Sequence, residues 1–221
     1  MHFRRTLTMM ILSFALTGHY LSQPSIRRHS SAASITGQNN DVFSRYKGLV
    51  DRAKVGDPTV DFVDLIAAYW DIEKRPIASE RPAMVQAFND KDYQRAVDLA
   101  EKVLDREFGN RNLHTVTANA YRELGDALKE TVHRNWAEQI LNAMLSTGDG
   151  KTLQTAFCVQ SVNDEYQIMS HFGYKTTGQA YIVSGQIDYD RLDGTEEKTG
   201  NAVSLYFDIS RHFSRCVKNK K

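Results

Sequence analysis

Several features that mark a special class of protein are scarce or missing in this chain of 221 residues. It has only 4 prolines and 41% of its residues are hydrophobic, which excludes a collagen-like, low-complexity or disordered chain. No run of about 18 apolar residues occurs, so no ordinary membrane-spanning helix is expected. The formal net charge of +1 argues against electrostatic binding of nucleic acid. We therefore expect one globular domain or two small ones.

The N-terminal segment lacks acidic side chains and differs from the rest of the chain. Arg4 and Arg5 precede an apolar run over residues 7–16, and the first carboxylate is that of Asp41. A short basic segment followed by an apolar run of this length is typical of a secretory signal peptide. We therefore expect residues 1–28 to be a signal peptide and the protein to be periplasmic or secreted. The alternatives are a mitochondrial transit peptide and an uncleaved N-terminal anchor.

The composition changes at several points behind this segment. Residues 29–40 are small and polar, which predicts a linker. A helical pattern covers residues 41–147, a strand-like pattern covers residues 148–211, and a basic tail follows over residues 212–221. We expect residues 41–211 to form one compact unit.

Apolar residues in the first half recur at helical spacing. One stripe begins near Phe62 and reaches Trp70, and a later one runs from Trp136 to Leu145. The most regular stripe consists of Tyr93, Ala96, Val97, Ala100, Val103 and Leu104. Spacing of this kind indicates amphipathic helices. We expect several helices that pack as antiparallel hairpins.

Part of the helical half shows the spacing of a tetratricopeptide unit, in which small residues let two helices approach closely. The residues are Tyr121, Leu124, Gly125, Leu128, Ala137, Leu141 and Met144. A weaker copy lies upstream, but the small residues Ala96 and Ala137 are not separated by a regular repeat. The alternatives are TPR-like helical hairpins, which could offer a partner protein a concave face, and an irregular helical bundle.

The second half changes to a period of two, which is typical of strands. Glycines within residues 146–150 are expected to end the helices by adopting the left-handed cap conformation. Strands are predicted at 155–161, 175–184, 186–192 and 202–209, with one short helix at 163–172. The sequence therefore predicts an α+β fold, in which helical hairpins pack against a small antiparallel β-sheet.

Searches for catalytic and metal-binding motifs give no complete site. Residues 147–152 resemble a phosphate-binding loop but follow a helix and lack its first glycine. Leu192 occupies a ligand position in the acidic segment that starts at Asp188, so no EF-hand loop is predicted. Glu130 and His133 have the spacing of half a di-iron site, but no second such pair exists. We expect His133 on a solvated helix face, and we predict no cofactor and no metal.

Two cysteines leave the redox state open. Cys158 lies in an apolar run and Cys216 lies in the basic tail. They permit one disulfide in an oxidising compartment. The alternative is a buried Cys158 thiol and a separate thiol at Cys216.

The order of several short motifs resembles a bacterial family known only as domain of unknown function 4919. The motifs are Asp61-Phe62-x-x-Leu65 with Tyr69, Ser146-Thr147-Gly148-Asp149-Gly150, Thr155-Ala156-Phe157-Cys158-Val159, Asp164-Glu165-Tyr166 with Phe172-Gly173, Tyr189-Asp190-x-Leu192 and Leu205-Tyr206-Phe207-Asp208-Ile209. The resemblance covers about residues 45–210. It implies an exported bacterial protein but no activity. It offers Glu165, Tyr166, Tyr189 and Asp190 as a candidate surface, without assigning them a role.

Three hypotheses follow for the function. The first is a non-enzymatic protein-interaction or accessory module that binds a protein partner on its helical face. The second is a small-ligand binder or an enzyme, which uses a pocket lined by tyrosines and acids on the C-terminal sheet. The tyrosines of that half are Tyr166, Tyr174, Tyr181, Tyr189 and Tyr206. The third is a purely structural accessory domain. None of them requires nucleic acid, or a transmembrane span after signal removal.

Overall fold

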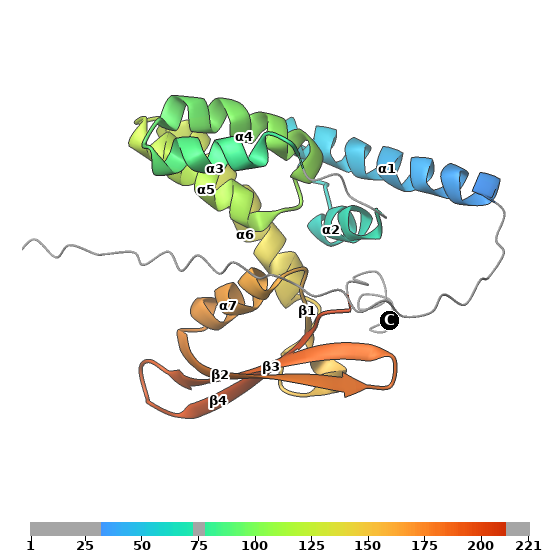
Figure 1. The fold of residues 1–221 in the computed structure, drawn as a ribbon, viewed down its shortest axis with the longest axis vertical. Coiled ribbons are helices and arrows are strands. Elements are labelled where there is room, and N and C mark those ends of the chain that lie inside the picture. Colours follow the sequence, from blue (N-terminus) through green and yellow to red (C-terminus); the bar gives the residue numbers. More distant parts are fainter. Residues whose placement is uncertain (1–31, 73–77, 211–221) are drawn as a thin grey trace, which may run out of the picture.

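The computed structural model describes residues 32–72 and 78–210, with side chains from residue 41 onward. Six helices come first: α1 (Ala32–Lys54), α2 (Phe62–Asp71), α3 (Arg81–Asn89), α4 (Tyr93–Glu107), α5 (Arg111–Glu123) and α6 (Ala127–Leu145). A short 3-10 turn (Leu153–Thr155), β1 (Phe157–Cys158), α7 (Val162–His171), β2 (Tyr174–Ser184), β3 (Ile187–Glu196) and β4 (Ala202–Asp208) follow. The predicted α+β class is confirmed. Figure 1 shows the helical layer above the sheet, with α7 between them.

The first helix begins inside the segment predicted to be a linker. Residues 29–40 are rich in Ser, Thr, Gly and Asn, which have low helix propensity, yet α1 starts at Ala32. The second half of α1 buries Tyr46, Val50 and Ala53 against the core. A helix that is held by such packing extends toward its N-terminus at little further cost. Packing later in the helix therefore overrides the local composition.

Four helices form two hairpins, α3 with α4 and α5 with α6. Helices α4, α5 and α6 are each preceded by a capping residue whose side chain accepts a hydrogen bond from the backbone N–H three positions later. These residues are Asp92, Asn110 and Asp126, which satisfy backbone donors that a helix end leaves unpaired. In Figure 1, α6 runs from the helical layer down toward the sheet. It therefore connects the two layers of the molecule.

The structure does not confirm the tetratricopeptide-like detail. Leu124 and Gly125 lie in the turn between α5 and α6, where Gly125 has a φ of +78°. Leu128 is 82% exposed, whereas Ala137 and Leu141 are buried as the pattern predicts. The Leu-Gly pair thus ends a helix and does not bring two helices together.

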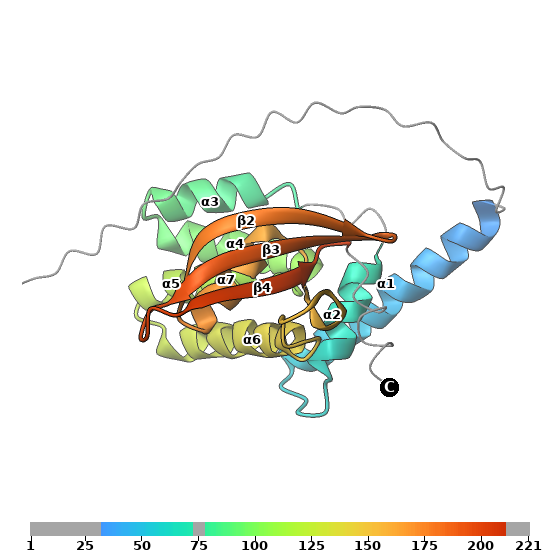
Figure 2. The same cartoon turned by 90° about the horizontal axis from the view of Figure 1, so that it is seen from below.

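The sheet is mixed, and not purely antiparallel as predicted. Its strand order is β1-β4-β3-β2, in which β2, β3 and β4 are antiparallel and β1 pairs with β4 in parallel. The strand predicted at 155–161 is reduced to two residues, because a 3-10 turn precedes it and the cap of α7 follows at Ser161. The short helix and the other three strands are confirmed. Figure 2 shows the three long strands side by side.

The largest hydrophobic cluster joins the helical region to the sheet. Its fully buried members include Leu65 of α2, Phe108 after α4, Ile168 of α7 and Phe207 of β4. Two smaller clusters are formed by Ala78 and by residues of α3, α4 and α5. The helical layer and the sheet therefore depend on the same core.

The glycines after α6 serve two different needs. Gly150 has a φ of +68°, as expected for a left-handed position. Gly148 does not, but a Cβ there would collide with the backbone oxygens of Thr155 and Ala156. The chain can therefore fold back on itself only because Gly148 has no side chain.

Candidate functional site

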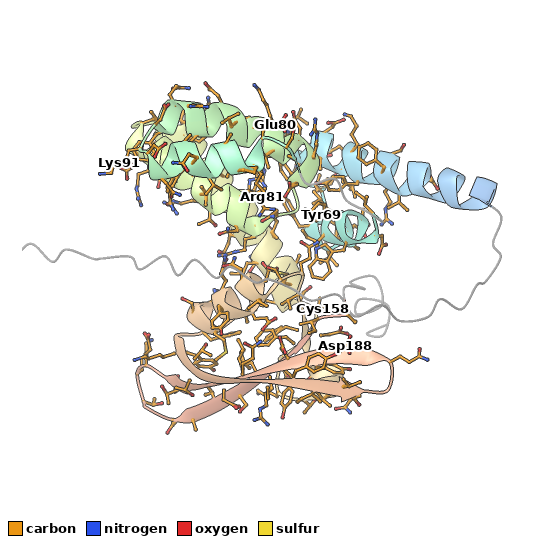
Figure 3. All side chains as sticks on the ribbon, viewed as in Figure 1. Tyr69, Glu80, Arg81, Lys91, Cys158 and Asp188 are labelled. Carbon is orange, nitrogen blue, oxygen red and sulfur yellow. The ribbon has the colours of Figure 1, made fainter. Side chains whose placement is uncertain are left out.

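A cleft with a volume of about 530 Å³ lies where α2, α5 and α6 meet the beginning of α7. Its apolar lining comes from Ile66, Tyr69 and Trp70 of α2 and from Ile140 and Met144 of α6. Figure 3 shows Tyr69 and Arg81 on the part of the helical layer that faces the sheet. A concave, partly apolar site of this size is typical of ligand binding.

One pair of opposite charges in the lining is already compensated. Arg81 Nη1 donates to Glu107 Oε2 over 3.1 Å, and the backbone N–H of Ala78 donates to Glu107 Oε1 over 3.0 Å. Glu107 is only 4% exposed, so its charge needs these partners. We therefore assign Arg81 and Glu107 a structural role at the rim.

Arg111, the first residue of α5, is in a different state. Its guanidinium forms no ion pair or hydrogen bond with any residue that the structure describes, although its Nε is buried. Burial lowers the pKa of Arg111, and the nearby carboxylates of Glu138 and Asp164 partly offset this shift. An arginine nevertheless stays charged at neutral pH. A buried nitrogen without a partner is unfavourable unless a ligand or water satisfies it.

Asp164 brings a carboxylate to the same cleft from the first turn of α7. It is 8% exposed and accepts a hydrogen bond from Ser161 Oγ over 2.9 Å. Burial raises the pKa of Asp164, while the bond from Ser161 and the charge of Arg111 oppose the shift. Gln160, the residue before Ser161, has a buried Nε2 without a partner. The cleft therefore offers a cation, an anion and a free amide donor.

The candidate surface predicted from the sequence is only partly brought together. Glu165 is fully buried and lies against Asp190, which is 6% exposed and accepts from Gln179 Nε2 over 2.8 Å. Burial and the charges of Asp190 and Asp164 raise the pKa of Glu165 to about 8. Neither carboxyl oxygen of Glu165 has a hydrogen-bond partner within the described residues. Glu165 is thus a buried acid that stays protonated at neutral pH and faces a second acid.

The two tyrosines of that surface lie elsewhere. Tyr166 is 44% exposed on α7, and Tyr189 is buried on the opposite face of β3 from Asp190. Glu165 and Asp190 do not line the cleft, which Asp164 does. The four residues therefore do not form one surface, and a role for the acid pair stays a prediction.

The helical region also contains a buried histidine pair that the sequence patterns did not predict. His133 is 2% exposed, not solvated as expected, and its Nδ1 lies 3.1 Å from Nδ1 of His114. His114 Nε2 contacts the carbonyl of Phe108 over 2.7 Å. His133 Nε2 lies 3.3 Å from Glu101 Oε1, which also accepts from the hydroxyl of Tyr121. Burial and His133 lower the pKa of His114 to about 3.

Helical spacing could have revealed this pair. His133 is in register with the buried residues Ala137, Ile140 and Met144 of α6, so it belongs to their face. Glu130, its expected partner in half a metal site, instead forms an ion pair with Arg134 at 2.7 Å. Within the described residues, no group of three or more His, Cys, Asp or Glu side chains could hold a metal ion.

Two further observations concern the predicted redox state and membrane spans. Cys158 is buried and disulfide-bonded, which excludes the thiol alternative for this residue. Cys216, the other cysteine of the sequence, lies outside the described residues, as do residues 1–31 and the rest of the basic tail. No helix within residues 32–72 or 78–210 has the length and hydropathy that crossing a membrane requires.

The described residues define an α+β protein with a helical layer, a four-stranded mixed sheet and a cleft between the helical layer and the beginning of α7. Compared with known families, the chain matches the one described as Domain of unknown function (DUF4919) over residues 32–218. This match covers most of the chain, so the protein belongs to that family, and the resemblance seen in the sequence is confirmed. No curated protein and no solved structure matches the chain.

Proposed function

We propose that the protein is an exported, non-enzymatic binding module, which takes a ligand or a segment of a partner protein into the cleft between the helical layer and α7. The observation that carries this proposal is the unpaired guanidinium of Arg111 in a preformed cavity of about 530 Å³. The charged groups left open there, Arg111 and Asp164, are suited to holding an ion or a polar group in place.

The cleft supports this function better than the acid pair does. Both carboxyl oxygens of Glu165 are buried, so a ligand could reach them only if α7 moved away from β3. Arg111 needs no such movement, because it already lines a cavity. The helical region as a whole supplies most of the lining residues, which agrees with a partner bound through that region.

Two observations support export. The family match begins at residue 32, behind the basic segment and the apolar run that predict a signal peptide. Cys158 is disulfide-bonded, and structural disulfides are typical of oxidising compartments. We expect N-terminal sequencing of the native protein to find a start between about residues 19 and 34, in the periplasmic or secreted fraction. An intact Met1 in the cytoplasm would contradict the export proposal.

A photocrosslinker inside the cleft tests the binding function. We would replace Asn112, which lines the cleft, by benzoylphenylalanine in the full chain, illuminate the protein in the cell fraction where it accumulates, and measure its intact mass. Asn142 is exposed on α6 outside the cleft and provides the matched control position. We expect a discrete adduct at position 112, absent at position 142 and strongly reduced when Arg111→Gln is added. Equal labelling at both positions, or none at either, would contradict the proposal.

A further inference from the structure

Four charged side chains line the cleft, and they divide into two kinds. Arg81 and Glu107 are bound to each other at 3.1 Å, so they present no net charge to a ligand. Arg111 and Asp164 influence each other through their charges but form no ion pair. They come from different elements, the first turn of α5 and the first turn of α7. The cleft therefore presents one open cation and one open anion that do not neutralise each other directly.

Each of these two groups selects for a different ligand charge. A guanidinium binds a carboxylate through two parallel hydrogen bonds, and the dipole of α5 adds positive potential at the same helix end. Asp164 is buried, and its hydrogen-bond partners, the Ser161 hydroxyl and the backbone of Gln160 and Ser161, are neutral groups and compensate a carboxylate less than a cation would. A simple anion would be repelled by Asp164, and a simple amine would be repelled by Arg111. A ligand that carries both charges satisfies both groups.

The rest of the cleft lining determines which group the ligand carries beside its two charges. Tyr69 and Trp70 from α2, with Ile140 and Met144 from α6, form an apolar wall. Gln160 Nε2 is buried without a partner and can donate to a carboxylate or a peptide carbonyl. A volume of about 530 Å³ exceeds the need of one small side chain and leaves room for a bulky one or for two residues. The lining thus fits an apolar group beside the two charges.

We infer that the cleft binds a zwitterionic, amino-acid-type ligand, whose carboxylate contacts Arg111, whose ammonium contacts Asp164 and whose apolar side chain lies against Tyr69 and Trp70. This inference rests on the proposed function and names its ligand class. A free apolar amino acid and a short peptide with free termini share this chemistry, and the test separates them.

Isothermal titration of the full chain with four probes tests the inference. Phenylalanine and the dipeptide Leu-Phe carry both charges, N-acetylphenylalanine lacks the ammonium, and phenethylamine lacks the carboxylate. We expect phenylalanine or Leu-Phe to bind at least about tenfold more tightly than either single-charge probe. Preference for phenylalanine would identify free amino acids, and preference for Leu-Phe would identify short peptides.

Three variants connect this preference to the residues. Arg111→Gln should weaken binding of the zwitterion about tenfold but should not weaken binding of phenethylamine, because it removes a like charge. Asp164→Asn should weaken binding of the zwitterion but not that of N-acetylphenylalanine, for the same reason. Arg122→Gln alters an exposed arginine of the same helix and should not change the affinity for the zwitterion or for the single-charge probes. Ser161 Oγ caps α7 by accepting from the backbone N–H of residue 164, which Asp164→Asn leaves in place, and a thermal melt of each variant tests folding.

The outcomes separate this inference from the proposed function. If no zwitterion binds, or if the single-charge probes bind as tightly, the ligand class is wrong. An adduct at position 112 that depends on Arg111 would in that case still support the binding function. If the zwitterions fail and that adduct is absent as well, both proposals are wrong.

Discussion

The helical region and the β-rich region each bury an ionisable centre, but they satisfy it in different ways. In the helical region, Glu101, His133 and His114 form a continuous chain of contacts that ends at the carbonyl of Phe108. In the β-rich region, Glu165 meets another acid, Asp190, and no base lies between them. The first centre is built from complementary groups, whereas in the second centre two acids face each other and burial keeps Glu165 protonated.

This difference has opposite consequences for stability against pH. His114 is held neutral, so acid favours the unfolded chain, in which a histidine takes up a proton more readily. Glu165 is held protonated, so base favours the unfolded chain, in which a glutamate loses its proton more readily. We therefore expect the two regions to set the two limits of the pH range in which the protein is stable.

The largest loss of stability should come from a substitution in the core that the two regions share. Phe207 of β4 is fully buried and lies near Phe157, so Phe207→Ala should lower the free energy of unfolding by about 3–5 kcal/mol. Both tryptophans, Trp70 and Trp136, belong to the helical region and report on it by fluorescence. We expect the urea midpoint of tryptophan fluorescence to fall together with that of circular dichroism. An unchanged fluorescence midpoint would show that the regions unfold independently.

A smaller effect is expected from breaking the histidine chain. His114→Leu leaves the Phe108 carbonyl and His133 Nδ1 without a partner, which should cost about 2–3 kcal/mol at pH 7. The pKa of His114 lies at about 3 in the folded state and near 6.5 in the unfolded chain. The wild type therefore loses stability as pH falls below about 6.5. The difference in free energy of unfolding between the wild type and His114→Leu should be about 2 kcal/mol smaller at pH 5 than at pH 7. Urea titrations at both pH values measure this difference. An equal difference at pH 7 and pH 5 would contradict a neutral His114.

The acid pair should respond in the opposite direction. The pKa of Glu165 is about 8 in the folded state and near 4.5 in the unfolded chain, so its stabilisation is complete below about pH 4.5 and disappears above about pH 8. Glu165→Gln has a similar size and stays neutral at every pH. Its free energy of unfolding should be close to that of the wild type at pH 5 and should exceed it by about 4 kcal/mol at pH 8.5.

The control for this substitution is Glu197→Gln, at an exposed position of the β-rich region. It should show no such dependence on pH in the same urea titrations. If the difference in free energy of unfolding between Glu165→Gln and the wild type is the same at both pH values, Glu165 is not held protonated in the folded state.

The smallest effect should come from Leu128, a residue of the tetratricopeptide-like pattern. It is 82% exposed, so Leu128→Ala should change the free energy of unfolding by less than about 0.5 kcal/mol. Leu141, from the same pattern, is buried, so Leu141→Ala should lower the free energy of unfolding by about 2–5 kcal/mol. Equal losses from thermal melts of the two variants would restore the repeat interpretation.

The fold class was predictable because periodicity records which face of each element is buried. The stripe from Tyr93 to Leu104 predicted α4, and the alternation around Leu205 and Phe207 predicted β4. The start of α1 was not predictable from composition, because packing at Tyr46 and Val50 holds that helix. The parallel pairing of β1 with β4 was also missed, because two residues carry no detectable period.

The candidate site was harder to predict, because its residues are distant in the sequence. Glu165 and Asp190 were predicted to matter and do meet, but they lie in the core and not at a surface. Arg111 gave no signal, since a single arginine after a capping residue is ordinary. Only the way that α5 and α7 approach each other shows that Arg111 and Asp164 share a cleft.

Native mass spectrometry of the full chain, purified from the cell fraction where it accumulates, tests the central claim most directly. We predict an added mass on the wild type and on Arg122→Gln, and its loss from Arg111→Gln. An added mass that persists in Arg111→Gln would show that binding does not use this cleft, and no added mass on any form would contradict the binding function.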